Sequence, residues 1–151
     1  KRSHYNMTEN NSKILVGSLE ICNLPSFDIE NLHIRVDTGA ATSSLHVDNI
    51  EEFNLNNQDW VRFDIHPDYH DVTKVVRKEA RVKDTKIIKS SNGTNQKRHF
   101  IETLFVLGDQ SWPILLTLTD RSSMSYLMLL GRQAMAGKLI VDAEFEYLLG
   151  K

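Results

Sequence analysis

The sequence contains a single cysteine and no long hydrophobic run. Cys22 on its own cannot build an internal disulfide framework or a multi-thiolate zinc site. It lies in the apolar stretch LVGSLEICNL, where a buried thiol is the expected state. No apolar run approaches the roughly 20 residues that a membrane span requires. We therefore expect a soluble domain without a membrane span, held together by a hydrophobic core.

An excess of charge of one sign is also absent. The chain has 18 Lys and Arg against 20 Asp and Glu, a net charge of −2, so nucleic acid and anionic membranes are not indicated as partners. The 7 glycines are scattered, and the phosphate-binding pattern Gly-x-x-x-x-Gly-Lys-Ser/Thr does not occur. The sequence thus predicts no bound cofactor, and any role of ATP would be exerted through a partner.

At 151 residues the chain has the length of one domain with a sizeable core. Its first twelve residues, KRSHYNMTENNS, are polar and aperiodic, which predicts a flexible lead-in over residues 1–12 and a single domain over residues 13–151. The compartment stays open between cytoplasm and periplasm or secretion, since the sequence starts at Lys1 and a signal peptide could precede it.

Short segments of alternating hydrophobicity dominate what remains. An Asn-Gly pair in SSNGT, residues 90–94, predicts a hairpin, and only GRQAMAGK near the end indicates a short helix. Together these patterns favour an all-β barrel or sandwich. The strand-like runs are KILVGSLEI, NLHIRVD, WVRFDIH, TKVVRKEARV, TKIIKSS, RHFIETLFVLG and WPILLTL.

The stretch IRVDTGAATSSLH carries the first candidate for chemistry. Asp37 ends an apolar run and is followed by a small hydroxyl residue and a glycine, so its carboxylate is expected at the lip of a sheet. Gly39 permits a sharp turn, and Thr38 is able to hydrogen-bond to neighbouring backbone. Taken alone, the tripeptide fits either a catalytic carboxylate or an ordinary turn.

A second motif, YLMLLGRQAM, is an apolar strand that ends in Leu-Leu-Gly and enters the short helix. Asp-Thr-Gly-Ala after one strand and Leu-Leu-Gly-Arg after a later one resemble the retropepsins, the single-domain aspartic proteases. The order VDTGAATSSLH, WVRF, SSNG, LTDRSSM, LLGR is similar to a bacterial retropepsin-like family. That family is commonly labelled putative ATP-dependent zinc protease and is often associated with an ATP-grasp ligase that modifies ribosomal protein. The resemblance covers most of Ile14–Tyr147. It implies a closed acid-protease β-barrel with one short C-terminal helix.

The resemblance also implies roles for individual residues. Asp37 would act as general acid or base, Thr38 would brace the opposite chain and Gly39 would shape the active-site loop. The support behind that loop would come from Leu130, Gly131 and Arg132. The residues implied to contact substrate, in the cleft or on the flap hairpin, are Ala40, Ser90, Ser91, Asn92, Gly93, Arg98 and Arg121.

The aspartic mechanism needs two carboxylates that share one proton, and the sequence has one Asp-Thr-Gly. The expected enzyme is therefore a homodimer, in which Asp37 meets its symmetry mate and a peptide or protein substrate is cleaved between them. The terminal segment LIVDAEFEYLL fits either a strand of a dimer sheet or a core strand. An ATP-grasp ligase is a further implied partner.

Arginines raise two further expectations. Retropepsins usually carry an aspartate after Asp-Thr-Gly-Ala that pairs with the Gly-Arg arginine, but this chain has Ala41 there, so Arg132 needs another partner. Arginines in the cleft would suit acidic peptides such as glutamate-rich tails, although exposed arginines are commonly only solvated. The candidates for that cleft are Arg35, Arg98, Arg121 and Arg132.

Two other functions stay open. One is a non-catalytic peptide-binding or scaffold module of the same fold. The other is a zinc hydrolase, which requires about three converging His or carboxylate ligands. The nearest pair is His66 and His70 in HPDYH, and because Pro67 disfavours a helix there, we interpret this stretch as a solvated loop. No metal ligand is assigned.

Overall fold

A computed structural model describes residues 12–68, 73–89, 93–120 and 125–151. The predicted lead-in lies almost entirely outside these residues and stays a prediction. The described chain is mostly strand, with the single-turn helix α1 (Arg132–Met135) and a 3₁₀ turn, η2 (Pro25–Phe27). The strands are β1 (Ile14–Val16), β2 (Leu19–Leu24), β3 (Ile29–Val36), β4 (Ser43–His46), β5 (Asp48–Leu55), β6 (Gln58–Ile65), β7 (Val76–Arg81), β8 (Asp84–Lys89), β9 (Asn95–Leu107), β10 (Gln110–Thr119), β11 (Met128–Leu130) and β12 (Leu139–Val141).

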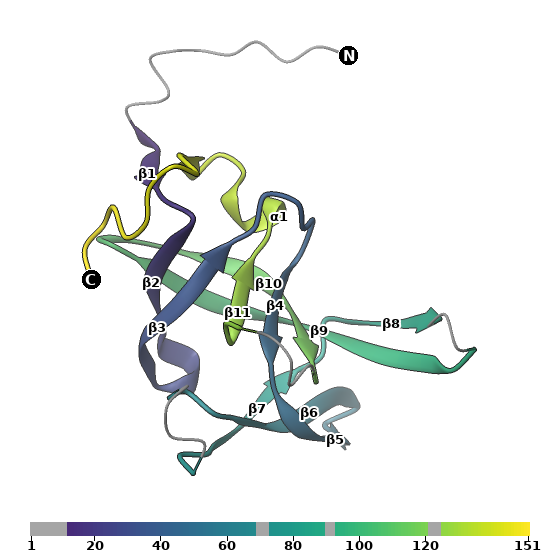
Figure 1. The fold of residues 1–151 in the computed structure, drawn as a ribbon. Helices are drawn as coiled ribbons and strands as arrows, with labels where there is room; N and C mark the ends of the chain where they lie inside the picture. Colours follow the sequence, from purple (N-terminus) through teal and green to yellow (C-terminus); the bar gives the residue numbers. More distant parts are fainter. Residues whose placement is uncertain (1–11, 69–72, 90–92, 121–124) are drawn as a thin grey trace.

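Six strands close into a barrel in the order β10-β4-β11-β3-β2-β9, because β9 also pairs with β10 (Figure 1). The interior of the barrel is filled by fully buried apolar side chains such as Leu45, Ile101, Phe105 and Leu116. A closed barrel leaves no unpaired edge within the ring. The predicted all-β closed barrel with one short C-terminal helix is confirmed, although the helix is one turn long instead of two.

The residue alternation of strand β3 determines where the candidate carboxylate, that of Asp37, is placed. Leu32, Ile34 and Val36 point into the barrel and are buried, whereas His33 and Arg35 are exposed on the other face. This alternation is the two-residue period of a half-buried strand. Since β3 lies between β2 and β11, the residue that follows it, Asp37, emerges at the end of a strand held on both sides.

A three-stranded sheet, β5-β6-β7, lies below the barrel in Figure 1. The sequence predicted β6 and β7 but missed β4 and β5. Strand β5 has the burial pattern of a mostly exposed strand and carries no apolar alternation, so its pairing with β6 rather than its own composition makes it a strand. Phe63 of β6 is fully buried and packs edge-on against Phe27, with 5.7 Å between ring centroids.

Strand β12 lies beside β1 of the same chain. The two pair in parallel, with Ile14 opposite Leu139 and Val16 opposite Val141. The terminal segment LIVDAEFEYLL fitted either a strand of a dimer sheet or a core strand of the same chain. Its first three residues, 139–141, pair within the chain. The chain continues past β12 alongside the start of β2, as Figure 1 shows near the label C.

The sequence predicted that Cys22 is buried and that no segment spans a membrane. Cys22 is buried inside the barrel, as predicted, and burial raises the pKa of its thiol far above the ordinary value. None of the helices in the described part of the chain is long and apolar enough to cross a membrane.

Phe63→Ala tests whether the aromatic contact holds the three-stranded sheet to the barrel. We expect the free energy of unfolding in urea to fall by about 3–5 kcal/mol, since a large buried ring is lost and a cavity remains. The matched control is Phe53→Ala, because Phe53 is only partly buried and stacks on Trp60 within the small sheet. Equal losses for the two variants would contradict this account.

Candidate active site

Asp37, a partly buried residue, follows directly after β3. Its backbone N–H donates to the carbonyl oxygen of Leu130 at 2.9 Å, and its carbonyl oxygen accepts from the N–H of Ala40 at 3.2 Å. The N–H of Gly39 donates to Oδ1 of Asp37, also at 2.9 Å. Asp37 thus both closes a turn and presents a carboxylate that the turn holds in one orientation.

Gly131 lies behind that turn, where the end of β11 packs closely against the backbone of Thr42. A Cβ atom on it would lie 2.5 Å from the carbonyl carbon of Thr42, a distance that real side chains do not reach. Its N–H donates to Oγ of the buried Ser43 at 3.0 Å. Only glycine lets the end of β11 pack this tightly against the chain after Asp37. Of the predicted support residues, Leu130 accepts a hydrogen bond from Asp37 itself, and Gly131 packs against Thr42 and Ser43, which follow the Asp37 turn.

Arg132 also reaches the loop. Its Nη1 donates to the carbonyl oxygen of Thr38 at 3.0 Å, and its backbone N–H donates to the carbonyl oxygen of Ala40 at 2.8 Å. A backbone carbonyl therefore takes the place of the side-chain partner that Ala41 cannot provide. This answers the question that the sequence raised about the partner of Arg132.

Two cavities open at Asp37. Arg35 and Tyr126 line both of them, and Arg35 makes no ion pair with any residue that the structure describes. The first, of about 300 Å³, is lined by Arg35, Asp37, Ser125, Tyr126 and Leu129. The second, of about 370 Å³, is lined by Ser18, Leu19, Arg35, Val36, Asp37, Thr38, Tyr126, Ala143 and Glu146.

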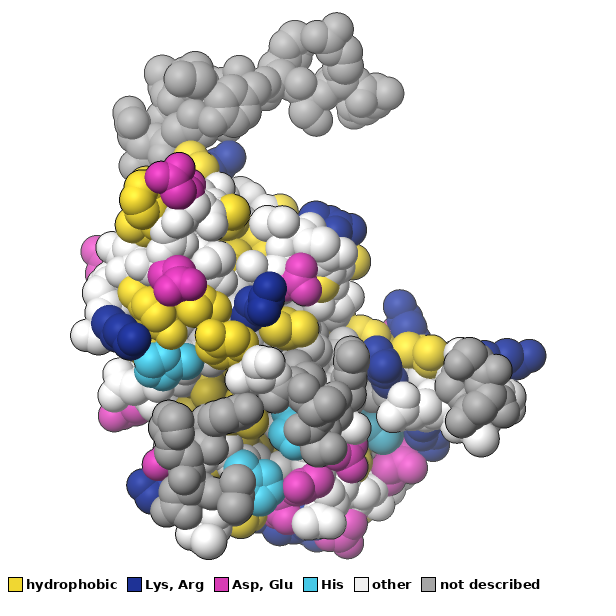
Figure 2. Space-filling model, in the orientation of Figure 1, with side chains coloured by type: hydrophobic (Ala, Val, Ile, Leu, Met, Phe, Trp, Pro, Cys, Tyr) yellow, Lys and Arg dark blue, Asp and Glu magenta, His cyan; other side chains and the backbone are white. Residues whose placement is uncertain are grey.

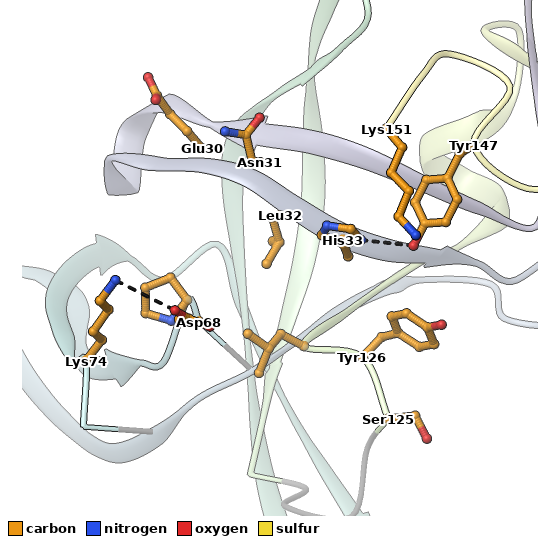
Figure 3. Close-up of a pocket in the computed structure, with 12 residues that line it drawn as sticks. Glu30, Asn31, Leu32, His33, Asp68, Lys74, Ser125, Tyr126, Tyr147 and Lys151 are labelled. Atoms are coloured by element: carbon orange, nitrogen blue, oxygen red, sulfur yellow. Dashed lines mark hydrogen bonds and ion pairs between the residues drawn. The ribbon is translucent and has the colours of Figure 1, made fainter. Parts of the chain in front are cut away.

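A larger cavity of about 780 Å³ continues from Ser125 and Tyr126 along the exposed face of β3 (Figure 3). On one side His33 and Tyr147 point toward each other, with 2.9 Å between Nδ1 and the hydroxyl. Burial, with smaller contributions from Tyr126 and Glu146, raises the pKa of the Tyr147 hydroxyl. On the other side Lys74 pairs with Asp68 at 3.6 Å. The three cavities form a run of concave surface centred on Tyr126.

Surface composition differs along the face that Figure 2 shows. Hydrophobic side chains gather over its upper, barrel half, whereas acidic side chains and histidines gather below, over the three-stranded sheet. Three acidic residues of that sheet form ion pairs with its arginines: Glu51 and Asp64 with Arg77, and Glu79 with Arg62. These arginines are therefore neutralised within the sheet, unlike Arg35, which has no ion pair among the described residues.

The predicted flap corresponds to the hairpin of β8 and β9, which projects from the barrel in Figure 1. Its arms pair from Asp84 opposite Phe100 to Lys89 opposite Asn95. Gly93 adopts a positive φ of 84°. Ser90, Ser91 and Asn92 lie outside the described residues, as does Arg121.

The other predicted contact residues lie in different places. Arg98 lies half-buried on β9 opposite Lys86 and is not among the residues that line the two cavities at Asp37. Ala40 lies in the Asp37 turn, where both of its backbone polar groups are engaged. The structure thus brings Arg35, among the predicted arginines, to the cavities beside Asp37.

Of the two histidines considered for zinc, the structure describes His66. His66 Nε2 lies 3.0 Å from Oδ2 of Asp48, and His70 lies outside the described residues. Within the described ranges, no three His, Cys, Asp or Glu side chains gather in a way that could hold a metal ion.

Sequence reasoning missed several residues of the site. Leu129 could have been found, since it alternates with the buried Met128 and Leu130 on a strand that pairs with β3. Tyr126 precedes that strand without a motif of its own. Glu146 and Ala143 reach the site because the C-terminal segment packs beside β2. No local sequence pattern predicts that packing.

A closed barrel in which one Asp-Thr-Gly turn is locked by a Gly-Arg pair defines a retropepsin-like domain. The family described as retropepsin-like aspartic endopeptidase RimB matches residues 15–151, and the chain belongs to this RimB-like family.

Similar proteins come from several bacteria. A probable alpha-L-glutamate ligase of Parasynechococcus marenigrum is 45% identical over 138 residues, which are 91% of this chain and 30% of the relative. One from Shewanella pealeana is 42% identical over 140 residues, 93% of this chain and 31% of the relative. The chain therefore spans about a third of the length of the curated relatives it matches. A crystal structure of a Legionella pneumophila protein of unknown function superimposes with a TM-score of 0.76 at 27% identity, covering 91% of this chain and 99% of the other.

Glu52 of β5 fastens the base of the β8–β9 hairpin to the three-stranded sheet. Its carboxylate lies 2.9 Å from Nζ of Lys97 and 3.1 Å from Nε2 of His99. The hydrogen bond from Lys97, followed by that from His99, lowers the pKa of Glu52 below its ordinary value. Because both Glu52 and Lys97 are about half exposed, the pair contributes little to global stability.

Glu52→Gln is expected to speed amide hydrogen exchange in β8 and the facing part of β9 at neutral pH, with the midpoint of global unfolding nearly unchanged. A lowered pKa in the folded state means that the attachment is fully present above the ordinary glutamate pKa and is lost as pH falls through the lowered one. Wild-type protection, corrected for intrinsic exchange rates, should fall over that acidic range. Glu102→Gln, on the exposed face of β9, is the control, and equal exchange in both variants would refute the attachment.

Proposed function

We propose that this chain is a homodimeric aspartic endopeptidase whose two Asp37 carboxylates share one proton. The supporting observation is the Asp37 turn: Asp37 is partly buried, and its carboxylate, held by the N–H of Gly39, opens onto two cavities. Membership in a family described as aspartic endopeptidases supports the same reaction class. Since the chain supplies one such turn, the second carboxylate comes from a second copy across a two-fold axis.

The mechanism follows from that pairing. The ionised Asp37 accepts a proton from water as the water oxygen bonds to the peptide carbonyl carbon, while the protonated Asp37 of the other copy gives its proton to the carbonyl oxygen. The tetrahedral intermediate then collapses: the carboxyl group that took the proton of water gives a proton to the amide nitrogen as the C–N bond breaks. The other carboxylate takes a proton from a hydroxyl of the intermediate as the carboxylic acid product forms, so one proton is restored to the pair. Two carboxylates a few ångström apart do not both ionise readily, which keeps one proton in the pair.

The proposed substrates are acidic peptides, in particular those with glutamate side chains. Arg35 is exposed, is unpaired among the described residues and lines both cavities at Asp37. A guanidinium group binds a carboxylate through two parallel hydrogen bonds. The names of the relatives, probable alpha-L-glutamate ligases, support a setting in which glutamate chains are made, and a ligase of that kind is the proposed partner.

Asp37→Asn is expected to lower kcat/KM for peptide cleavage by about 10⁴-fold, because the variant removes a group that takes part in both proton transfers. The dimer mass in sedimentation and the thermal unfolding midpoint should not change. Asp109→Asn, in the turn between β9 and β10, is the control and should cleave as the wild type does.

Three results would contradict the proposed enzyme. An Asp37→Asn variant that still cleaves would remove Asp37 from the chemistry, and a fully active monomer would remove the shared dyad. A wild type that binds peptides but never cleaves them would support the non-catalytic peptide-binding module instead.

Arg35→Gln is expected to lower kcat/KM for a glutamate-containing peptide by about 10–100-fold, because the charge-assisted hydrogen bonds between the guanidinium and the glutamate carboxylate are lost. Cleavage of the matching peptide with glutamine in place of glutamate should change by less than about threefold, since a neutral side chain makes no ion pair with Arg35. Arg81→Gln, at the end of β7, controls for the loss of a positive charge. Equal losses on both peptides would refute selection by Arg35.

A further inference from the structure

Glu20 is a carboxylate with no exposed surface, on a β2 position that faces the barrel interior. It accepts three backbone hydrogen bonds: Oε2 from the N–H of Gly17 at 2.8 Å and of Leu148 at 2.9 Å, and Oε1 from the N–H of Leu149 at 3.2 Å. A buried ionised carboxylate is costly unless it is hydrogen-bonded in this way. Two of the three donors belong to the end of the chain, more than 120 residues away in sequence.

Those donors belong to the segment that follows β12, Asp142–Gly150, which we name the C-terminal arm. The arm runs beside the start of β2: the N–H of Ser18 donates to the carbonyl oxygen of Phe145 at 2.8 Å, and the N–H of Tyr147 donates to that of Leu19 at 2.8 Å. The packing leaves no room for a side chain at Gly17, where a Cβ atom would lie 2.3 Å from the carbonyl oxygen of Phe145.

The arm also forms part of the concave surface around Asp37. Ala143 and Glu146 line the 370 Å³ cavity together with Asp37. Tyr147 lines the 780 Å³ cavity and binds His33 through its hydroxyl, and in Figure 3 its ring lies across the cavity from Lys74 and Asp68. One face of the arm is thus held by Glu20 while other residues of the arm face the groove.

We propose that Glu20 is a positioning residue that holds the C-terminal arm in place as one wall of the peptide-binding groove. The proposal rests on the proposed function for the identity of the groove's occupant. Glu20 contacts no reacting atom. It acts through the arm, so its loss affects the binding of peptide more than the chemical step.

Glu20→Gln in the full chain tests the proposal, because the amide keeps the size of the side chain but offers one acceptor oxygen instead of two. We expect amide exchange at Leu148 and Leu149 to rise at least about tenfold. For a glutamate-containing peptide, KM should rise about tenfold with kcat within about twofold, as for the loss of uniform binding. Glu144→Gln removes the same charge from the arm without touching Glu20 or the lining of the cavities at Asp37, and it should match the wild type.

A second measurement separates this proposal from the proposed function. Both substitutions are repeated in an Asp37→Asn background and titrated with fluorescein-labelled hexaglutamate, so that binding is seen without cleavage. Weaker binding with Glu20→Gln alone supports the arm as a wall even if the wild type cleaves nothing. The proposal would be overturned if Glu20→Gln speeds amide exchange in the arm but leaves KM and hexaglutamate binding unchanged. It would also be overturned if amide exchange in the arm does not change. If Glu20→Gln does not fold, Gly17→Ala displaces the arm at Phe145 and is judged by the same criteria.

Discussion

The packing of Gly131 against the backbone of Thr42 is the contact on which the rest of the site depends. It brings the end of β11 within hydrogen-bonding distance of the chain that follows β3, so that the carbonyl of Leu130 receives the N–H of Asp37 and Arg132 reaches the carbonyl of Thr38. Any side chain at position 131 would push these two segments apart. The orientation of the Asp37 carboxylate is therefore set by the close approach of two backbones, and the barrel around them is what keeps both in place.

The barrel carries two additions, the three-stranded sheet and the C-terminal arm, and each is fastened to it by identifiable contacts. The three-stranded sheet is fixed to the barrel through Phe63 and Phe27, and it reaches the base of the β8–β9 hairpin through Glu52. The C-terminal arm is fixed to β2 through Glu20 and reaches the cavities through Glu146 and Tyr147. In each case an acidic side chain makes the link. The partly exposed pairing of Glu52 is weak and adjustable, whereas the fully buried Glu20 holds its partners firmly.

Electrostatics around Asp37 follow from which charges are already neutralised. Glu79 is paired with Arg62, and Glu51 and Asp64 are paired with Arg77. Arg132 donates to the backbone carbonyl oxygen of Thr38. Arg35 has no such partner among the described residues, and it projects from the exposed face of β3, two residues before Asp37. A positive charge at this point, next to the Asp37 carboxylate, fits the proposed groove for negatively charged peptide side chains.

The sequence alone determined the features that depend on neighbours along the chain. The two-residue alternation of β3, the turn chemistry of Asp-Thr-Gly, the Leu-Leu-Gly-Arg end of β11 and the paired arms around Asn-Gly are all local. These patterns predicted an all-β barrel or sandwich with Asp37 at a strand end, and the resemblance of the motifs to the retropepsins implied that the barrel is closed. The tertiary structure decided the features that depend on residues far apart. Strand β5 exists through its pairing with β6, Arg132 takes the carbonyl of Thr38, and Arg35 rather than Arg98 faces the cavities at Asp37. In the sequence Glu20 is one polar residue within the apolar stretch LVGSLEICNL, and two of the three backbone groups that donate to it come from the C-terminal arm. The alternation of apolar and polar residues predicts which face of a strand is buried. It does not predict which backbone groups, distant in sequence, that face will contact.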